Sequence, residues 1–315
     1  MTTAGRLRPL VMLLTGAVVF GGVLSINKIA LDSGVPYLGY FFWYCLGGGL
    51  LSGVAALVAG RNPLPTSWRH LRAYVALALI GIVAPMGLMI YVADKLPPSI
   101  VGLVMLLTPP LTYLLALAVK LERFRWLSIA GIALGLAGVL VLTLPKTSLP
   151  EPGMLGWLLL ALGAPLTFAI ANIGLAMLRP PGTNSAQFAS GILLAAALVL
   201  LPIAFAAGSL YGFPAANPTG NWAILAVVLC VAGYWWLMLE VVRLAGAVFF
   251  SFFNYPAVIA SIVFAVLLFG DAPSAWLFLA LALMAAGVAL VSHAGRTRAA
   301  ETARSGGDLG AGDGA

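Results

Sequence analysis

The chain of 315 residues is 62% hydrophobic and only 8% charged, with a mean hydropathy of +1.08. Soluble domains carry about 25% charged residues, so this composition excludes a soluble fold and predicts an integral membrane protein. The net charge of +7 is spread over short connections and forms no basic stripe with interleaved aromatic residues. We therefore expect no nucleic-acid partner.

Long apolar runs predict an all-α membrane protein with ten spanning helices. A bilayer core about 30 Å thick needs about 20 apolar residues per helix. The first run is too long for a signal peptide and lacks a small-residue cleavage site, so we interpret it as an uncleaved span. The predicted spans are 9–31, 38–60, 71–93, 98–119, 125–144, 154–177, 187–207, 221–242, 245–269 and 274–293.

The distribution of basic residues predicts the orientation of these spans. Cytoplasmic flanks of membrane proteins accumulate Lys and Arg. If the N-terminus is inside, 13 of the 16 Lys and Arg residues fall in cytoplasmic segments. We therefore predict a multi-pass protein of the cell (inner) membrane with both termini in the cytoplasm.

The two halves of the chain show a weak internal repeat. The Ala, Leu, Gly and Val pattern of residues 133–139 recurs at 282–288, and Pro109 and Pro256 are 147 residues apart. Because each half would hold five spans, an odd number, the second half must insert upside down. Ten spans suffice for a complete cavity, so we expect a monomer and leave a homodimer open. The predicted divisions are a first repeat at 1–147, a second, inverted repeat at 148–294 and a disordered cytoplasmic tail at 295–315.

Prolines interrupt several predicted spans. The stretch 98–122 carries a proline pair near its middle, and 246–271 carries a proline in the corresponding place. Proline removes a backbone donor and kinks a helix, and membranes tolerate this where a cavity or other groups satisfy the freed carbonyls. Broken spans in corresponding positions of two halves point to a transporter's binding site. The candidate gating hinges are Pro85, Pro109, Pro110, Pro165 and Pro256, and the alternative is that they are kinks needed only for packing.

Four features together resemble a known superfamily. They are Asn27 in the first span, a proline near the middle of the fourth, Glu122 soon after it, and the Gly-rich run GIALGLAGVLVL at 131–142. Their order and spacing resemble the drug/metabolite transporter superfamily, and in particular its EamA-type members, which have two five-helix halves. The second half departs from this pattern, with Asp271 in place of the acid and no lysine beside Asn172. The resemblance implies an asymmetric site in an exporter of small metabolites, among which amino-acid exporters, including aromatic ones, are prominent.

Aromatic and polar residues deep in the spans are the candidate substrate ligands. A lining of this kind suits an apolar or aromatic substrate with a few polar handles. Lys28 is either a ligand for a substrate carboxylate or the partner of Asp32, four residues later on the same helical face. The candidate substrate-binding residues are Asn27, Lys28, Tyr44, Tyr91, Pro109, Tyr113, Asn172, Tyr234, Trp235 and Asn254.

The predicted function is export of small organic metabolites, above all aromatic or other apolar amino acids, by facilitative or weakly coupled alternating access. The alternative is a multidrug or cationic-compound exporter that uses proton antiport. Small four-helix antiporters of the same superfamily rely on a first-span glutamate, and this chain has no carboxylate between residues 10 and 30.

A membrane enzyme is the third class, and the sequence does not favour it. The two histidines, His70 and His293, fall at the ends of predicted spans, away from any acid or serine at depth. Glu240 and Arg243 are three residues apart, which predicts a local ion pair. We expect neither a metal nor a cofactor; the partners we expect are the lipid bilayer and a small-molecule substrate.

Overall fold

The computed structural model describes residues 3–62, 64–92, 107–143 and 155–269, with a few helical residues between 279 and 290. These residues form helices and connections, and the described ranges contain no β-strand. The all-α class is therefore confirmed. The predicted tail at 295–315, the first half of the predicted fourth span and most of the tenth lie outside the described residues.

The described helices include one π-helical segment, η1, which interrupts the third predicted span. In chain order they are α1 (Thr3–Asp32), α2 (Tyr37–Val58), α3 (Trp68–Ala78), η1 (Leu79–Val83), α4 (Ala84–Val92), α6 (Thr108–Ala118), α7 (Trp126–Thr143), α8 (Leu155–Ala161), α9 (Gly163–Met177), α10 (Ser185–Ala206), α11 (Pro218–Ser251) and α12 (Asn254–Phe269).

Six helical segments of the described chain are long and apolar enough to cross a membrane. They correspond to the predicted spans 1, 2, 3, 6, 7 and 8, because long apolar runs are the clearest signal in a membrane protein sequence. The predicted boundary between 221–242 and 245–269 falls close to an observed break in the helix. Helix α11 continues to Ser251 and departs from helical geometry at Gly246, where φ is 85° and ψ is 169°. Glycine adopts such a positive φ without a steric penalty, which explains why the break falls there.

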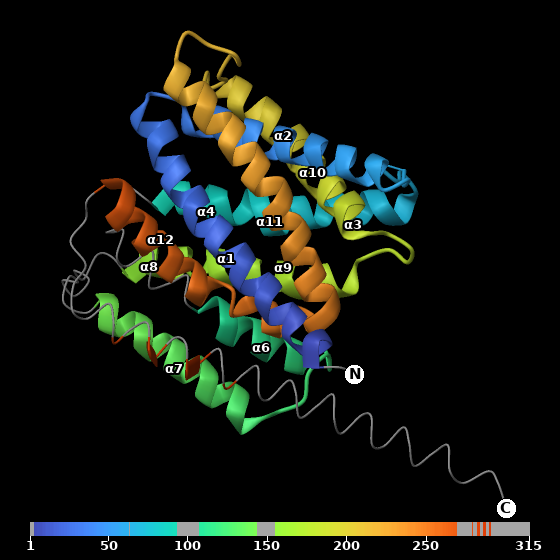
Figure 1. Cartoon of the computed structure of the whole chain (residues 1–315), viewed down its shortest axis with the longest axis vertical. Coiled ribbons are helices and arrows are strands. Elements are labelled where there is room, and N and C mark those ends of the chain that lie inside the picture. The colour runs from blue at the N-terminus through green and yellow to red at the C-terminus, as the bar shows by residue number, and fades with distance from the viewer. Residues whose placement is uncertain are drawn as a thin grey trace, which may run out of the picture.

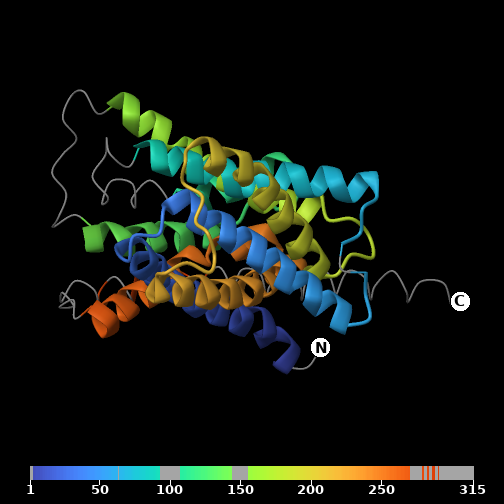
Figure 2. The same ribbon diagram turned by 90° about the horizontal axis from the view of Figure 1, so that it is seen from above.

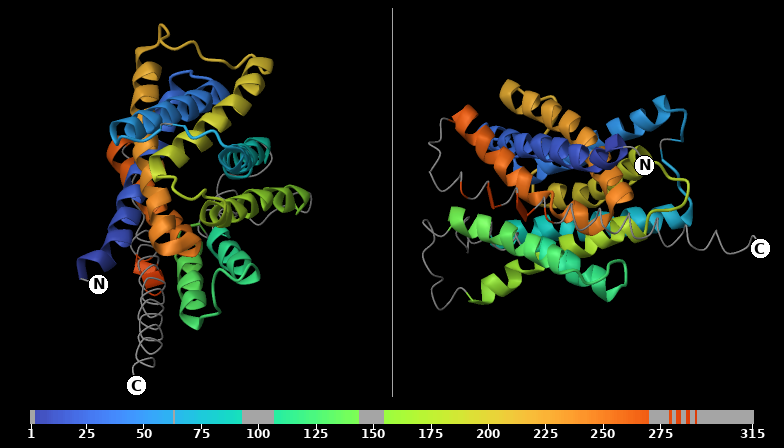
Figure 3. Two further views of the ribbon diagram at one scale, coloured as in Figure 1. Left: turned by 90° about the vertical axis from the view of Figure 1, so that its right-hand side faces the viewer. Right: turned by 60° about the horizontal axis from the view of Figure 1, so that its bottom comes forward.

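The helices pack in two groups (Figures 1 and 3). Helix α2 runs along α10, and α1 packs against α11 and α12. A large apolar core joins α1, α2, α3, α10 and α11. A smaller core around Tyr113 and Tyr255 joins α6, α7 and α12, and Figure 3 shows α6 and α7 on the side of the molecule away from α2.

Small residues allow the helices of the large core to approach closely. A Cβ atom placed on Gly48 would collide with the side chain of Val231, and one on Gly49 would collide with Leu194. Close backbone approach at glycine is a common basis of helix association in membranes. Helix α2 is thereby fixed against both α10 and α11.

The connections of the described chain lie at two opposite ends of the molecule (Figure 2). The N-terminal end of α1 and the α2–α3 and α9–α10 connections lie at one end, and the α1–α2 and α10–α11 connections lie at the other. We call the first end the basic end. The α6–α7 connection also lies at this end, beside the start of α1 (Figure 1). The basic residues in or near these connections are Arg61, Arg69, Arg72, Lys120, Arg123, Arg125, Arg179 and Arg243.

Candidate substrate cavity

The prolines singled out in the sequence stand at breaks between helices. Pro109 and Pro110 occupy the first turn of α6, and Pro165 and Pro256 lie in the first turns of α9 and α12. Proline is tolerated in a first turn because its missing N–H would have no intrahelical partner there. Pro85 is the second residue of α4, two residues after the end of η1, whose wider turn accommodates a residue without a backbone donor. Pro109, Pro110, Pro165 and Pro256 therefore mark helix starts, whereas Pro85 lies inside a continuous helical span beside its π-helical turn.

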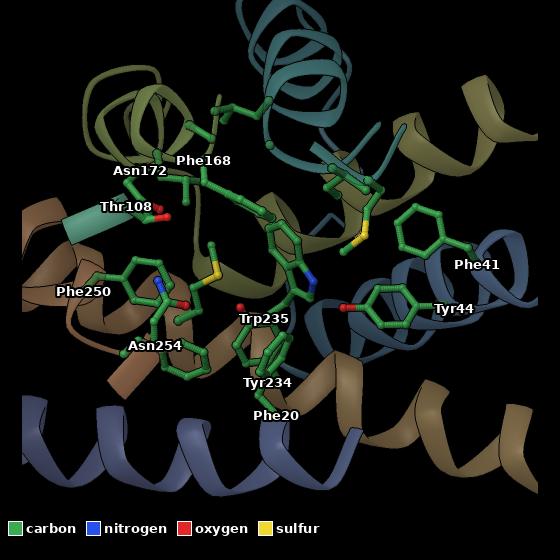
Figure 4. Close-up of a pocket in the computed structure, with 18 residues that line it drawn as sticks. Phe20, Phe41, Tyr44, Thr108, Phe168, Asn172, Tyr234, Trp235, Phe250 and Asn254 are labelled. Carbon is green, nitrogen blue, oxygen red and sulfur yellow. The ribbon is translucent and has the colours of Figure 1, made fainter. Parts of the chain in front are cut away.

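A cavity of about 130 Å³ lies where several of these helix starts converge. It is lined by residues of α1, α2, α3, η1, α4, α6, α9, α11 and α12 (Figure 4). At one water per about 10–15 Å³ of such space, it has room for on the order of ten water molecules. The cavity is therefore large enough for a small organic molecule.

Aromatic rings form one wall of the cavity. The ring centroids of Phe20 and Tyr234 are 5.0 Å apart, and Phe253 lies 5.5 Å from Phe20 and 5.3 Å from Tyr234. Rings at these separations pack in tilted and edge-to-face geometries that favour each other electrostatically. Figure 4 shows Phe20 and Tyr234 together on the side of the cavity that faces α1, with Phe168 across from them.

Hydroxyl and amide groups gather at one side of the cavity, where Thr108, Asn172 and Asn254 lie near one another (Figure 4). Asn172 Nδ2 donates a hydrogen bond of 3.3 Å to Thr112 Oγ1, and Thr112 Oγ1 donates one of 2.8 Å to the carbonyl oxygen of Thr108. These bonds tie α9 to the start of α6. Asn254, the first residue of α12, is only half-buried.

A second polar group lies across the cavity, formed by Tyr44 and Trp235. The indole Nε1 of Trp235 is buried and has no hydrogen-bond partner within the described part of the chain. Figure 4 shows this nitrogen turned toward the side of the cavity where the Tyr44 hydroxyl lies. An unpaired buried donor costs about 1–3 kcal/mol. A ligand that offers an acceptor would recover that free energy.

The described residues that line the cavity carry no formal charge. Their polar atoms belong to hydroxyl, amide and indole groups. A charged group in such surroundings would lose much of its hydration without gaining an ionic partner. The lining therefore suits a molecule that is neutral or carries balanced charges.

The structure brings half of the sequence-predicted substrate residues together. Tyr44, Asn172, Tyr234, Trp235 and Asn254 all line the cavity. They come from α2, α9, α11 and α12, which are far apart in the sequence.

The other candidates lie elsewhere. Asn27 accepts a hydrogen bond of 2.7 Å from the Tyr40 hydroxyl. Lys28 Nζ lies 2.7 Å from Asp32 Oδ2, and the two side chains are 56% and 61% exposed. The ion pair that the four-residue spacing allowed is thus present.

Three further candidates contribute no described side chain to the lining. Tyr113 is buried in the smaller core, where its hydroxyl donates to the carbonyl oxygen of Arg123 at 3.2 Å and accepts from the backbone N–H of Arg125 at 2.8 Å. Pro109 is buried beside Thr108. The side chain of Tyr91 lies outside the described residues.

Sequence reasoning missed several lining residues. Thr108 lines the cavity directly before the proline pair, and that position was the available signal. Gly81 and Ile82 line it from η1. No feature of the apolar run around them indicates a π-helical turn, although such turns are frequent at functional sites.

Comparison with known proteins agrees with this architecture. Residues 7–144 match the EamA-like transporter family, so the N-terminal part of the chain forms an EamA-like transporter domain. The crystal structure of another protein, which is 21% identical to this chain in sequence, superposes on it with a TM-score of 0.71. The superposition covers 91% of this chain and 98% of the other chain. That likeness establishes the fold. A search of curated proteins gave no match.

The class of the protein follows from these findings. It is a multi-pass membrane protein, and its matched domain is typical of transporters of small molecules. The family that matches residues 7–144 is described as a transporter family.

Proposed function

We propose that the protein exports small organic metabolites, above all amino acids with aromatic or other apolar side chains, by alternating access. The observation that carries this proposal is the aromatic cavity, which has uncharged polar groups on two sides and lies where broken helices meet. Ligand sites are mainly apolar, with a few polar groups that fix orientation. Substrate rings would pack on the aromatic wall while the polar groups bind the amino and carboxyl groups.

The helix starts at the cavity support a pair of inverted repeats. Helix α6 begins at Thr108 with a proline pair, and α12 begins at Asn254 with Pro256 two residues later. Both first residues line the cavity. We propose that α6 and α12 are corresponding half-helices of the repeats 1–147 and 148–294, because discontinuous helices at a repeat interface are typical of transporter sites.

The charge difference between the two ends supports an orientation. Basic residues accumulate on cytoplasmic flanks, so we place the basic end in the cytoplasm of the cell (inner) membrane, with both termini on that side. Because ten spans in one chain would suffice for a complete cavity, we propose a monomer as the transporting unit.

A multidrug or cationic-compound exporter that uses proton antiport is the competing function. Such a transporter needs an acidic group in its cavity, because an ionisable residue at depth carries the proton or pairs with the cation. The described lining residues include no carboxylate. We therefore favour facilitative or weakly coupled transport.

Transport by the purified protein in proteoliposomes tests the proposal. Labelled phenylalanine, tryptophan and leucine are supplied with a labelled cationic dye as the competing substrate, and protein-free liposomes serve as the blank. We expect saturable movement of the amino acids down their gradients without a stoichiometric proton flux. Absence of transport, or transport of the cation alone with proton antiport, would contradict the proposal.

A further inference from the structure

A buried carboxylate at the basic end binds two neighbouring groups. Glu240 is 8% exposed. Its Oε1 accepts a hydrogen bond of 2.5 Å from Ser185 Oγ, and its Oε2 accepts one of 3.0 Å from Arg243 Nε. Ser185 is the first residue of α10 and Glu240 belongs to α11. The Glu240 carboxylate therefore links α10 to α11, in addition to forming a local ion pair with Arg243 along α11.

Arg179 extends this cluster to the α9–α10 connection. Its Nη2 donates to Ser185 Oγ at 2.9 Å, and its Nε and Nη2 donate to the carbonyl oxygen of Thr183 at 3.1 and 3.0 Å. Its Nη1 reaches the carbonyl oxygen of Leu239 at 3.4 Å. Burial lowers the pKa of Arg179, Glu240 raises it and Arg243 lowers it. The guanidinium remains charged, since an arginine in a protein does not lose its proton.

His70 connects the cluster to α3. One ring nitrogen, Nε2, lies 2.9 Å from Thr183 Oγ1, and the other, Nδ1, lies 2.7 Å from Ser67 Oγ. We call the set Ser67, His70, Arg179, Thr183, Ser185, Glu240 and Arg243 the basic-end network. It holds together α3, α10, α11 and the connection that follows α9.

The basic-end network is continuous with the cavity wall. Leu77 of α3, Leu175 of α9 and Met238 of α11 all line the cavity. Leu175 precedes Arg179 by one helical turn, and Met238 precedes Glu240 by two residues. The bonds of the network therefore fix the spacing of the three helices that wall the cavity toward the basic end.

The chain changes direction at Gly246, three residues after Arg243. The φ angle of Gly246 is 85°, a backbone angle that residues other than glycine rarely adopt. A Cβ atom on Gly246 would nevertheless meet no atom within 4 Å. Glycine is therefore favoured at this position by the backbone conformation, and not by a lack of room for a side chain. Beyond it, Phe250, Phe253 and Asn254 line the cavity. The segment before Gly246 is thus hydrogen-bonded to α10 through Glu240, and the segment after it contributes residues to the cavity wall.

We propose that the basic-end network is a latch that closes the cavity toward the basic end, and that Gly246 is the hinge about which 247–254 moves when it opens. Water can replace each bond of a polar network as an end opens, so opening leaves no polar group of the network unpaired. Hinges are a few residues that absorb a large change of φ and ψ. The purpose of the latch rests on the proposed transport function, whereas its test measures access alone.

The test follows the reactivity of a cysteine in the cavity. Leu175→Cys is made in the full-length chain with Cys45 and Cys230 replaced by alanine, and the protein is reconstituted in liposomes. A membrane-impermeant maleimide is added to the side that the basic end faces or to the opposite side, and the labelling rate is measured. Arg179→Met removes the centre of the latch, and Gly246→Ala disfavours the hinge conformation.

Two matched controls accompany these variants. Gly233→Ala lies on the same helix, where a Cβ atom also meets nothing within 4 Å and φ is not positive. Arg72→Met removes an exposed charge at the same end. Both controls should label at the rate of the parent.

We expect labelling from the basic-end side to rise on the order of tenfold in Arg179→Met and severalfold in Gly246→Ala, as for a typical shift between two conformations. Labelling from the opposite side should not rise. Unchanged rates in both variants would overturn the latch, and so would an equal rise from both sides, which would indicate general loosening. If Arg179→Met fails to give a monodisperse protein, Arg179→Lys and Gly246→Ala decide the question. The expected labelling pattern without transport of any metabolite would contradict the proposed function but not the latch.

Discussion

The cavity and the basic-end network both contain buried polar groups, but these groups differ in charge and in hydrogen bonding. In the cavity the groups are uncharged, and the Trp235 indole N–H has no partner in the described structure. In the network the groups include charged residues, and Glu240 has both carboxylate oxygens bonded. An unpaired buried donor lowers stability, whereas a bonded charge fixes its neighbours. The first region is therefore suited to binding a ligand and the second to holding helices in place.

The largest expected effect is on stability, from Glu240→Ala. The substitution leaves Ser185 and Arg243 without their shared acceptor. We expect it to reduce the free energy of unfolding by about 2 kcal/mol, less than for a fully buried pair because Arg243 is half-exposed. Thermal unfolding in detergent, followed by size-exclusion chromatography, measures this. Asp32→Asn breaks the exposed pair with Lys28 and should cost less than about 1 kcal/mol. Equal losses in the two variants would contradict the comparison.

The next effect is on substrate affinity, from Trp235→Phe. The change keeps an aromatic ring in the cavity and removes the N–H donor, so we expect KM for an aromatic amino acid to rise about tenfold, which corresponds to about 1.4 kcal/mol. Trp236→Phe is the matched control, because Trp236 is the neighbouring residue and is 41% exposed. Transport in proteoliposomes measures both. An unchanged KM in Trp235→Phe would show that the donor does not serve the substrate.

A smaller effect should distinguish Asn172 from Asn27, which were both candidate substrate ligands in the sequence analysis. Asn172→Ala removes a cavity amide and its bond to Thr112, and we expect KM to rise about fivefold, as for loss of about one hydrogen bond. Asn27→Ala removes only the acceptor of Tyr40 and should leave KM within about twofold. The reverse order of effects would move the substrate site toward Asn27 and Lys28.

The smallest effect should come from the helix starts. Pro256→Ala restores a backbone N–H in the first turn of α12 and frees Tyr255 from the restriction that a following proline imposes. We expect the maximal transport rate to change about twofold to threefold with KM unchanged, because hinge positions govern gating more than binding. Pro202→Ala, in an exposed position inside α10, should leave the rate unchanged. A change in KM alone would assign Pro256 to binding instead.

The sequence predicted those parts of the molecule that depend on local signals. The spans α1, α2 and α10 were predicted because length and apolarity suffice to identify them. The Glu240–Arg243 pair follows from its three-residue spacing and is confirmed. Its partner Ser185 is 55 residues away, and no periodicity indicates a contact of that range.

Part of the cavity lining was also predictable from local signals. Tyr234 and Trp235 were identified by their depth in a span. Lys28 was a candidate because a charge within an apolar run signals function, yet it lies only four residues from the end of α1 and pairs with Asp32. Which face of a helix meets the cavity depends on tertiary packing, which one sequence does not reveal.

Substrate protection of a single cysteine tests most directly whether the cavity is the transport site. Ala171 lines the cavity, and its neighbour Ile170 is 40% exposed on the other face of α9. Ala171→Cys and Ile170→Cys are each made in the chain with Cys45 and Cys230 replaced by alanine. Each is labelled with a thiol reagent in the presence and absence of phenylalanine or tryptophan. We predict that the amino acids slow the labelling of Ala171→Cys severalfold and leave that of Ile170→Cys unchanged. Transport of these amino acids without protection of Ala171→Cys would contradict the assignment.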